Sequence, residues 1–212
     1  YYVIMSLYLG CPLIQQPQSC LRCKQPSDNY GHHALHCSDG GQLITRHNRI
    51  RDRVQFYAKQ AGYMTRIEQK YTELKQQSDD IVEGIPGDIV IRQWFDQDPL
   101  NGVKDMYGDV VVGNIFASTY IAHTSQERLW LAKKKEQLKK DKYNNIQELE
   151  PLAIETMGAL GNGFKRVLQK SADRIATRKN VTYPRMMNRI RTDIVANLMK
   201  CNAEMILSSI TL

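Results

Sequence analysis

Apolar residues recur at helical spacing in four parts of the chain. Between residues 43 and 61 they fall three or four positions apart, which predicts an amphipathic helix ending near Gly62, a residue suited to a helix C-cap. The same periodicity predicts three later helices, at Ser125–Tyr143, Leu160–Arg178 and Tyr183–Ser208. Residues 1–19 are expected to form an apolar lead-in that ends in a loop of Pro and Gln residues.

Strands are predicted where short apolar runs lie between turn residues. These segments are YMTRIEQKY at 63–71, IPGDIVIRQWF at 85–95, DMYGDVVVGNIF at 105–116 and EPLAIETMG at 150–158. Helices that follow and separate strands around one core indicate an α/β or α+β fold. We expect three units: a lead-in and small module at 1–40, the main core at 41–178, and a C-terminal helical extension at 179–212.

The composition fits a globular protein with a sizeable core. The chain has 212 residues, of which 42% are apolar. No stretch approaches eighteen consecutive apolar residues, so we expect no membrane span. The opening YYVIMSLYLGCPL has neither a basic region nor an initiator Met, so we expect a fragment of a longer polypeptide.

Charge is distributed unevenly along the chain, with a net value of +7. Acidic residues outnumber basic ones between Arg66 and Asp109, whereas the chain is strongly basic from Lys133 onward. A basic surface around an acidic centre is typical of a protein that holds a polyanion over a cation site. The lysine-rich LAKKKEQLKKDKY can equally be a solvated helix face.

Cysteine and histidine cluster in CLRCKQPSDNYGHHALHC, residues 20–37. Cys20 and Cys23 have the spacing of a zinc knuckle, and Cys37 with one histidine would complete a Cys3His set for Zn²⁺. We favour His33 as the fourth ligand, with His32 as the alternative. A set that fills all four positions leaves none for substrate, so the zinc is expected to be structural. Clustered thiolates of this kind also indicate a reducing compartment.

Two aspartates form a second, less obvious constellation. Asp88 begins one predicted strand, in PGD, and Asp109 lies on the next, in YGDVVV. Adjacent antiparallel strands would bring these carboxylates together, as in the PD-(D/E)-x-K nuclease core, where they bind Mg²⁺ or Mn²⁺ for water activation. The lysine usual two residues after the second acid is Val111 here. Aspartates at such positions are also common as strand-edge or cap residues.

The order of these motifs resembles a known family. LGCPL, the Cys/His segment, RHNRIRD, GIPGDIVI, GDVVV, KKDKY and PLAIETMGALG follow one another from about Leu9 to Gly161. This order resembles the C-terminal region of site-specific non-LTR retrotransposon proteins and related reverse-transcriptase-like proteins. In that family a CCHC zinc knuckle precedes a restriction-like endonuclease domain.

The resemblance implies a fold, a reaction and a set of residues. It implies a PD-(D/E)XK restriction-endonuclease-like core that nicks DNA for target-primed reverse transcription, with Asp88 and Asp109 on Mg²⁺ or Mn²⁺. The family's displaced catalytic lysine lies in K-x-x-K-Y, which matches Lys139, Lys142 and Tyr143 here. The implied partners are DNA, possibly RNA, and the reverse transcriptase region of the same polypeptide. The implied location is the nucleus.

Other polar residues have lesser predicted roles. Five basic side chains are expected to contact nucleic acid: Arg46, Arg49, Arg53, Lys165 and Arg166. His47 lies on the apolar stripe of its helix and is expected to be a core histidine, and Tyr143 is expected to pack against its helix. Glu68 is a candidate third acid. Glu155 matches the family motif without an assigned role.

A non-enzymatic function remains the alternative. The chain could be a catalytically inactive, zinc-containing nucleic-acid-binding domain in which the nuclease fold serves only as a scaffold. Val111 in place of the usual lysine favours this alternative. A third hypothesis is a purely structural interaction domain.

Overall fold

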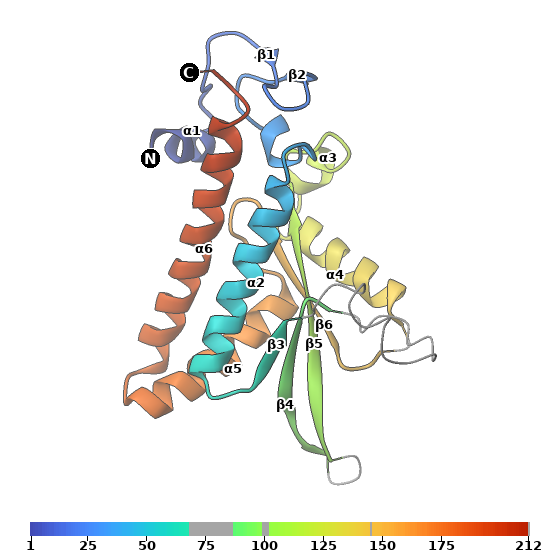
Figure 1. The fold of residues 1–212 in the computed structure, drawn as a ribbon, viewed down its shortest axis with the longest axis vertical. Helices are drawn as coiled ribbons and strands as arrows, with labels where there is room; N and C mark the ends of the chain where they lie inside the picture. Colours follow the sequence, from blue (N-terminus) through green and yellow to red (C-terminus); the bar gives the residue numbers. More distant parts are fainter. Residues whose placement is uncertain (68–86, 99–101, 145, 212) are drawn as a thin grey trace.

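The fold is mixed α/β and is built around a four-stranded sheet. The computed structural model describes residues 1–67, 87–98, 102–144 and 146–211 (Figure 1). The strands are β3 (Thr65–Ile67), β4 (Ile89–Asp98), β5 (Gly102–Gly113) and β6 (Leu149–Glu155), adjacent in that order. The first three are antiparallel neighbours, whereas β6 runs parallel to β5. The predicted α/β class is therefore confirmed.

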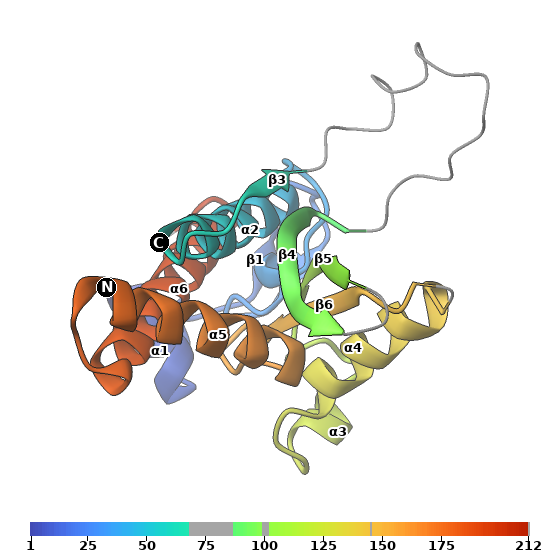
Figure 2. The same cartoon turned by 90° about the horizontal axis from the view of Figure 1, so that it is seen from below.

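Helices cover both faces of the sheet (Figure 2). One side carries α2 (Gln42–Gln60), α5 (Asn162–Lys179) and α6 (Tyr183–Leu207), and the other carries α4 (Trp130–Lys142), preceded by the short α3 (Ile121–Thr124). Alternation along β5 decides which side chain meets which layer. Met106 and Val110 enter the core beneath the three helices, whereas Asp109 points toward α4.

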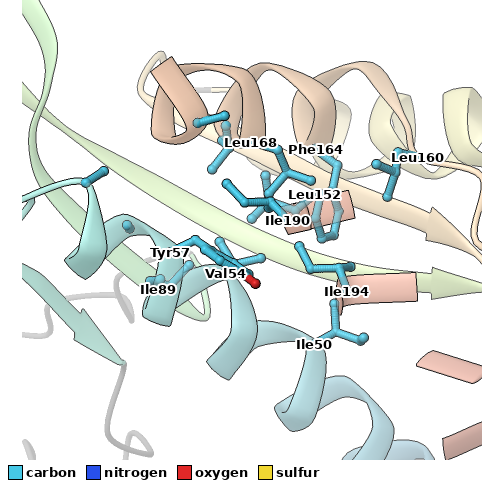
Figure 3. Packing of buried hydrophobic residues seen from close by; sticks show 14 of the residues in the cluster. Ile50, Val54, Tyr57, Ile89, Leu152, Leu160, Phe164, Leu168, Ile190 and Ile194 are labelled. Atoms are coloured by element: carbon cyan, nitrogen blue, oxygen red, sulfur yellow. The ribbon is translucent and has the colours of Figure 1, made fainter. Parts of the chain in front are cut away.

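Apolar side chains of the strands and helices pack together in one main core (Figure 3). Ile89 and Ile91 of β4 point into it, as the alternation of the sequence predicts. Leu152 of β6 is fully buried, as expected for a strand between two helical layers. Phe164 of α5 closes the core over this strand.

The C-terminal helix α6 belongs to two hydrophobic clusters. Ile190 and Ile194 pack in the main core, while Ile206 joins a smaller cluster with Leu35 and with Leu7 of α1 (Tyr2–Leu9). The predicted C-terminal extension thus packs as a continuous part of the fold. The division of the chain into three units stays a prediction.

The predicted elements differ from the observed ones mainly at their ends. The helix expected from Ser125 begins at Trp130, after Leu129 with φ 64°, and the strand expected at 63–71 is seen as Thr65–Ile67 within the described residues. Helix α1 was not predicted, since its residues are apolar all round and give no periodic signal. None of the helices in the described ranges is long and apolar enough to cross a membrane.

The core role of α6 leads to a stability prediction. Ile194→Ala is expected to lower the free energy of unfolding by about 2–5 kcal/mol, because it leaves a cavity beneath the sheet. The control is Leu207→Ala on the same helix, where the side chain is 46% exposed and little change is expected. Urea denaturation measures both. Equal, small effects would show that α6 is a loosely attached extension.

Candidate functional site

The Cys/His segment folds into a compact cluster of four ligand atoms. The thiols of Cys20, Cys23 and Cys37 and a ring nitrogen of His33 all lie within 4.8 Å of one another. The Cys20 and Cys37 sulfurs are 4.0 Å apart, and Cys23 Sγ is 3.2 Å from His33 Nε2. Zinc at about 2.3 Å from sulfur and about 2.0 Å from nitrogen fits such separations. These four residues could therefore bind a metal such as zinc.

The fold of the knuckle selects between the two candidate histidines. His32 stacks on Phe116, with ring centroids 4.0 Å apart and an interplanar angle of 6°. This stacking directs its ring away from the cluster and toward the segment after β5. His33, in the short 3₁₀ helix η1 (His33–Leu35), carries the imidazole that joins the three thiols.

Asp28 organises the loop between the two halves of the cluster. Its carboxylate accepts the backbone N–H groups of Tyr30, His32 and His33 at 2.8–3.0 Å. Burial raises the pKa of Asp28, but these hydrogen bonds outweigh it and hold the pKa below its ordinary value. Sequence reasoning missed this residue, although Asp ahead of Asn-x-Gly is a signal for a side-chain-stabilised turn.

The two predicted acids meet at the start of β4. The backbone N–H of Asp88 donates to Gly108 O at 2.7 Å, and its Oδ2 accepts the N–H of Val110 at 2.7 Å. The Asp88 carboxylate thereby accepts a hydrogen bond that a main-chain carbonyl would accept in a regular sheet. It also lies against the carboxylate of Asp109. Gly87 has φ 122°, and a Cβ there would be 3.1 Å from Gly108 O. Glycine thus permits the close entry of the strand.

Lys139 of α4 approaches the Asp109 carboxylate. Its Nζ lies 2.7 Å from Asp109 Oδ2, and Asp109 is nearly buried, with 8% of its side chain exposed. Lys142 is exposed and lies with its Nζ 4.9 Å from the centroid of the Tyr143 ring. Of the two matched lysines, the structure brings Lys139 to the carboxylates and leaves Lys142 at the surface. The catalytic role of either lysine stays a prediction.

Two buried glutamates hold the helix that carries Lys139. Glu155, at the end of β6, accepts the backbone N–H of Ala132 at 3.1 Å and so caps the first turn of α4. Glu136 of α4 accepts the N–H of Gly163 at 2.9 Å and caps α5 in the same way. A Cβ at Gly161 would overlap the Glu136 carboxylate, so a side chain there would displace the group that caps α5. The matched but unexplained Glu155 therefore has a positioning role.

His47 is part of this site, and the prediction of a core histidine is wrong. Its Nε2 lies 2.9 Å from Asp88 Oδ2, and 29% of its side chain is exposed. The apolar stripe of α2 passes over the start of β4, where the carboxylate of Asp88 takes the place of an apolar side chain. Sequence reasoning missed the contact because His47 and Asp88 are 41 positions apart.

The environment separates the pKa values of the two acids. For Asp88, burial raises the pKa, but the hydrogen bond and charge of His47 and the Val110 N–H outweigh it, so the pKa is lowered. For Asp109, burial raises the pKa, Lys139 opposes this, and the neighbouring Asp88 charge adds to it, so the pKa is raised. Asp88 is thus held as a carboxylate beside a partner that takes up a proton more readily.

Most of the predicted nucleic-acid contacts are engaged within the protein. Arg46 is 3% exposed and donates to Asn202 Oδ1 and Leu35 O, both at 3.0 Å. Burial lowers its pKa to about 10. A phosphate contact by Arg46 does not fit this placement. Its guanidinium instead joins the knuckle and α6 to the start of α2.

Of the other four basic residues, three form ion pairs with acidic side chains of the protein and one does not. Arg49 pairs with Glu204 at 3.1 Å, Arg53 with Asp193 at 2.7 Å and Arg166 with Glu150 at 2.6 Å. Lys165 is half-buried and makes no ion pair or hydrogen bond with another described side chain. The candidate acid Glu68 lies outside the described residues.

Comparisons with known protein families, with curated proteins and with solved structures find no match. The functional argument therefore depends on the residues of the site and their geometry.

The choice of His33 gives a metal-binding prediction. His33→Ala is expected to abolish stoichiometric zinc binding, because three thiolates remain for a tetrahedral site that needs four ligands. His32→Ala is the matched control and is expected to retain zinc, since its ring stacks on Phe116. Native mass spectrometry of both variants measures the zinc content. Loss of zinc in His32→Ala alone would contradict the assignment.

The capping of α5 gives a second prediction. Glu136→Ala is expected to lower the free energy of unfolding by about 1–3 kcal/mol, because the Gly163 N–H loses its buried acceptor. Glu136→Gln keeps an oxygen acceptor without the charge. Burial raises the pKa of Glu136, so its ionised form is disfavoured in the fold, and we expect the Gln variant to be at least as stable as wild type at pH 7. Urea denaturation at pH 7 compares them; a stable Ala variant would contradict the cap.

Proposed function

We propose that this protein is a metal-dependent DNA endonuclease of the PD-(D/E)XK restriction-like kind that nicks a strand. One observation carries the proposal. Asp88, just before β4, lies beside Asp109 of β5, and the amine of Lys139 reaches Asp109 from a separate helix thirty residues later in the chain. Two acids and a lysine are the groups that phosphodiester hydrolysis on this kind of core requires.

The donor set fits a hard divalent cation. Mg²⁺ and Mn²⁺ prefer oxygen ligands and are often held by one or two carboxylates together with water and substrate phosphate. Asp88 and Asp109 would supply the carboxylates. When bound, such an ion lowers the pKa of a coordinated water and neutralises charge on the phosphate.

The remaining residues have separate tasks. His47 and the Val110 N–H hold Asp88 ionised and fix the direction of its carboxylate. Lys139 provides a positive charge beside the scissile phosphate, where negative charge develops in the transition state. Lys139 approaches the sheet from the face on which Asp109 lies, the face where a lysine at the Val111 position would stand. The displaced lysine therefore replaces the missing one without a change in the strands.

The wider setting follows from the same proposal. The Cys20, Cys23, His33 and Cys37 cluster would hold a structural zinc and stabilise the start of α2, from which His47 reaches the site. The motif order supports a role in target-primed reverse transcription in the nucleus. The partners would be DNA, possibly RNA, and the reverse transcriptase region of the same polypeptide.

One observation favours the alternative of a non-catalytic nucleic-acid-binding domain. Each carboxylate already has a partner inside the protein, Lys139 for Asp109 and His47 for Asp88. Contacts of this kind can stabilise a fold without a metal. The two functions differ in metal-dependent cleavage and not in DNA binding.

A nicking assay on supercoiled plasmid with Mg²⁺ or Mn²⁺ tests the proposal. Asp88→Asn and Asp109→Asn are each expected to lower the nicking rate by at least about 10²-fold, because each removes a charged ligand. Lys139→Gln is expected to have an effect of similar size. Lys142→Gln is the matched control on the same helix and should cut like wild type.

The same series separates the two functions. Metal-dependent nicking that disappears in the aspartate variants supports the endonuclease. DNA binding without metal-dependent nicking would establish the non-catalytic alternative. Nicking that survives in both aspartate variants would overturn the assignment of the site.

A further inference from the structure

A pocket away from the two aspartates gathers three basic side chains. It has a volume of about 270 Å³ and lies between the start of α4, the loop after β6, and helices α5 and α6. Arg128 precedes α4, Lys165 lies near the start of α5, and Arg191 comes from α6. No acidic residue lines the pocket. Among the described residues, none of these three cations forms an ion pair or a hydrogen bond with a side chain.

Four acids on the elements around the pocket are engaged elsewhere. Glu127 pairs with Lys133 at 2.7 Å, Glu150 with Arg166, and Asp193 with Arg53. Glu136 is occupied in capping α5. Three of these carboxylates therefore neutralise other cations, and the fourth accepts a main-chain N–H. Among the described residues, no carboxylate forms an ion pair with Arg128, Lys165 or Arg191.

The walls of the pocket favour an anion further. Leu129, Leu160 and Met187 line it and exclude water from part of its surface, which strengthens electrostatic attraction there. Leu129 has φ 64° and ψ 14°, a left-handed conformation that is unfavourable for a residue with a Cβ. This turn places Arg128 at the pocket. Backbone strain of this kind persists where the surrounding structure enforces it, often at ligand sites.

We propose that Arg128, Lys165 and Arg191 form a second binding site, which takes a backbone phosphate of the DNA strand away from the point of cleavage. The identity of the ligand rests on the proposed endonuclease function. Phosphate matches the site because three cations converge from three elements, whereas reading of bases would need hydrogen-bonding groups aimed at base edges. The site would fix the position of the strand without selecting its sequence.

The geometry also predicts a spacing. Helix α4 begins at Trp130, next to the turn that carries Arg128, and Lys139 follows Trp130 by nine residues, a rise of roughly 14 Å along the helix axis. DNA advances about 3.4 Å per base pair, so the bound phosphate is expected about four nucleotides from the nick. Ethylation interference on a nicked substrate would locate it.

Binding of a short fluorescently labelled DNA duplex tests the site independently of cleavage. The triple variant Arg128→Gln, Lys165→Gln, Arg191→Gln is expected to bind roughly tenfold or more weakly than wild type by fluorescence anisotropy. The slope of log K against log salt concentration is expected to fall by about 0.9 for each lost contact. The matched control, Lys59→Gln, Arg185→Gln, Lys200→Gln, removes the same charge from exposed residues without described partners. Lys165→Gln alone serves if the triple variant does not fold.

The outcomes distinguish this inference from the proposed function. Weak binding by the triple variant but not by the control supports the site, whether or not wild-type protein nicks plasmid. Equal binding by the two triple variants overturns the site even if nicking depends on Asp88. Inorganic phosphate measured by calorimetry is the third arm. Phosphate binding that the triple variant loses, together with unchanged DNA affinity, would assign the pocket to a free anion and overturn the DNA assignment.

Discussion

Two buried hydrogen bonds that glutamates accept from helix N-termini set the geometry of this protein. Glu155 joins β6 to the first turn of α4, and Glu136 joins α4 to the first turn of α5. A carboxylate is costly to bury unless it is hydrogen-bonded, and the N–H groups and dipole of a helix N-terminus meet that need. The direction of α4 across the sheet is therefore determined by two buried groups that cannot lose their partners cheaply. Both proposed sites depend on that direction.

The position of Lys139 is one consequence. Lys139 lies one helical turn after Glu136 on α4. The hydrogen bond by which Glu136 caps α5 therefore also fixes the position along β5 at which Lys139 contacts Asp109. Arg128, just before the same helix, reaches the basic pocket at its other end. One helix thus links the carboxylates to the pocket. This arrangement suits a strand that is held at one point and cut at another.

The Cys/His cluster supports the site from a distance and has no open position of its own for chemistry. Leu35 O of the knuckle accepts a hydrogen bond from the buried guanidinium of Arg46. The same guanidinium donates to Asn202 of α6. The next residue, His47, holds Asp88. Hydrogen bonds from two successive residues of α2 thus connect the knuckle and the last helix, through Arg46, and the first acid, through His47. Metal binding at the knuckle would stabilise the turn of α2 that presents the histidine.

The sequence by itself determined most of the helices and strands, the three cysteines of the knuckle and the pairing of the two aspartates, because spacing and alternation are local properties of a chain. It left His32 and His33 as alternatives, which the stacking of His32 on Phe116 separates. It could not separate Lys139 from the other lysines of its run, since only the direction of α4 decides which one meets Asp109. Nor could it show that Arg46 is buried or that His47 leaves the core for Asp88, because both follow from packing between distant segments. The tertiary structure decided these roles by fixing which charges find partners inside the fold and which, like Lys165, find none among the described side chains.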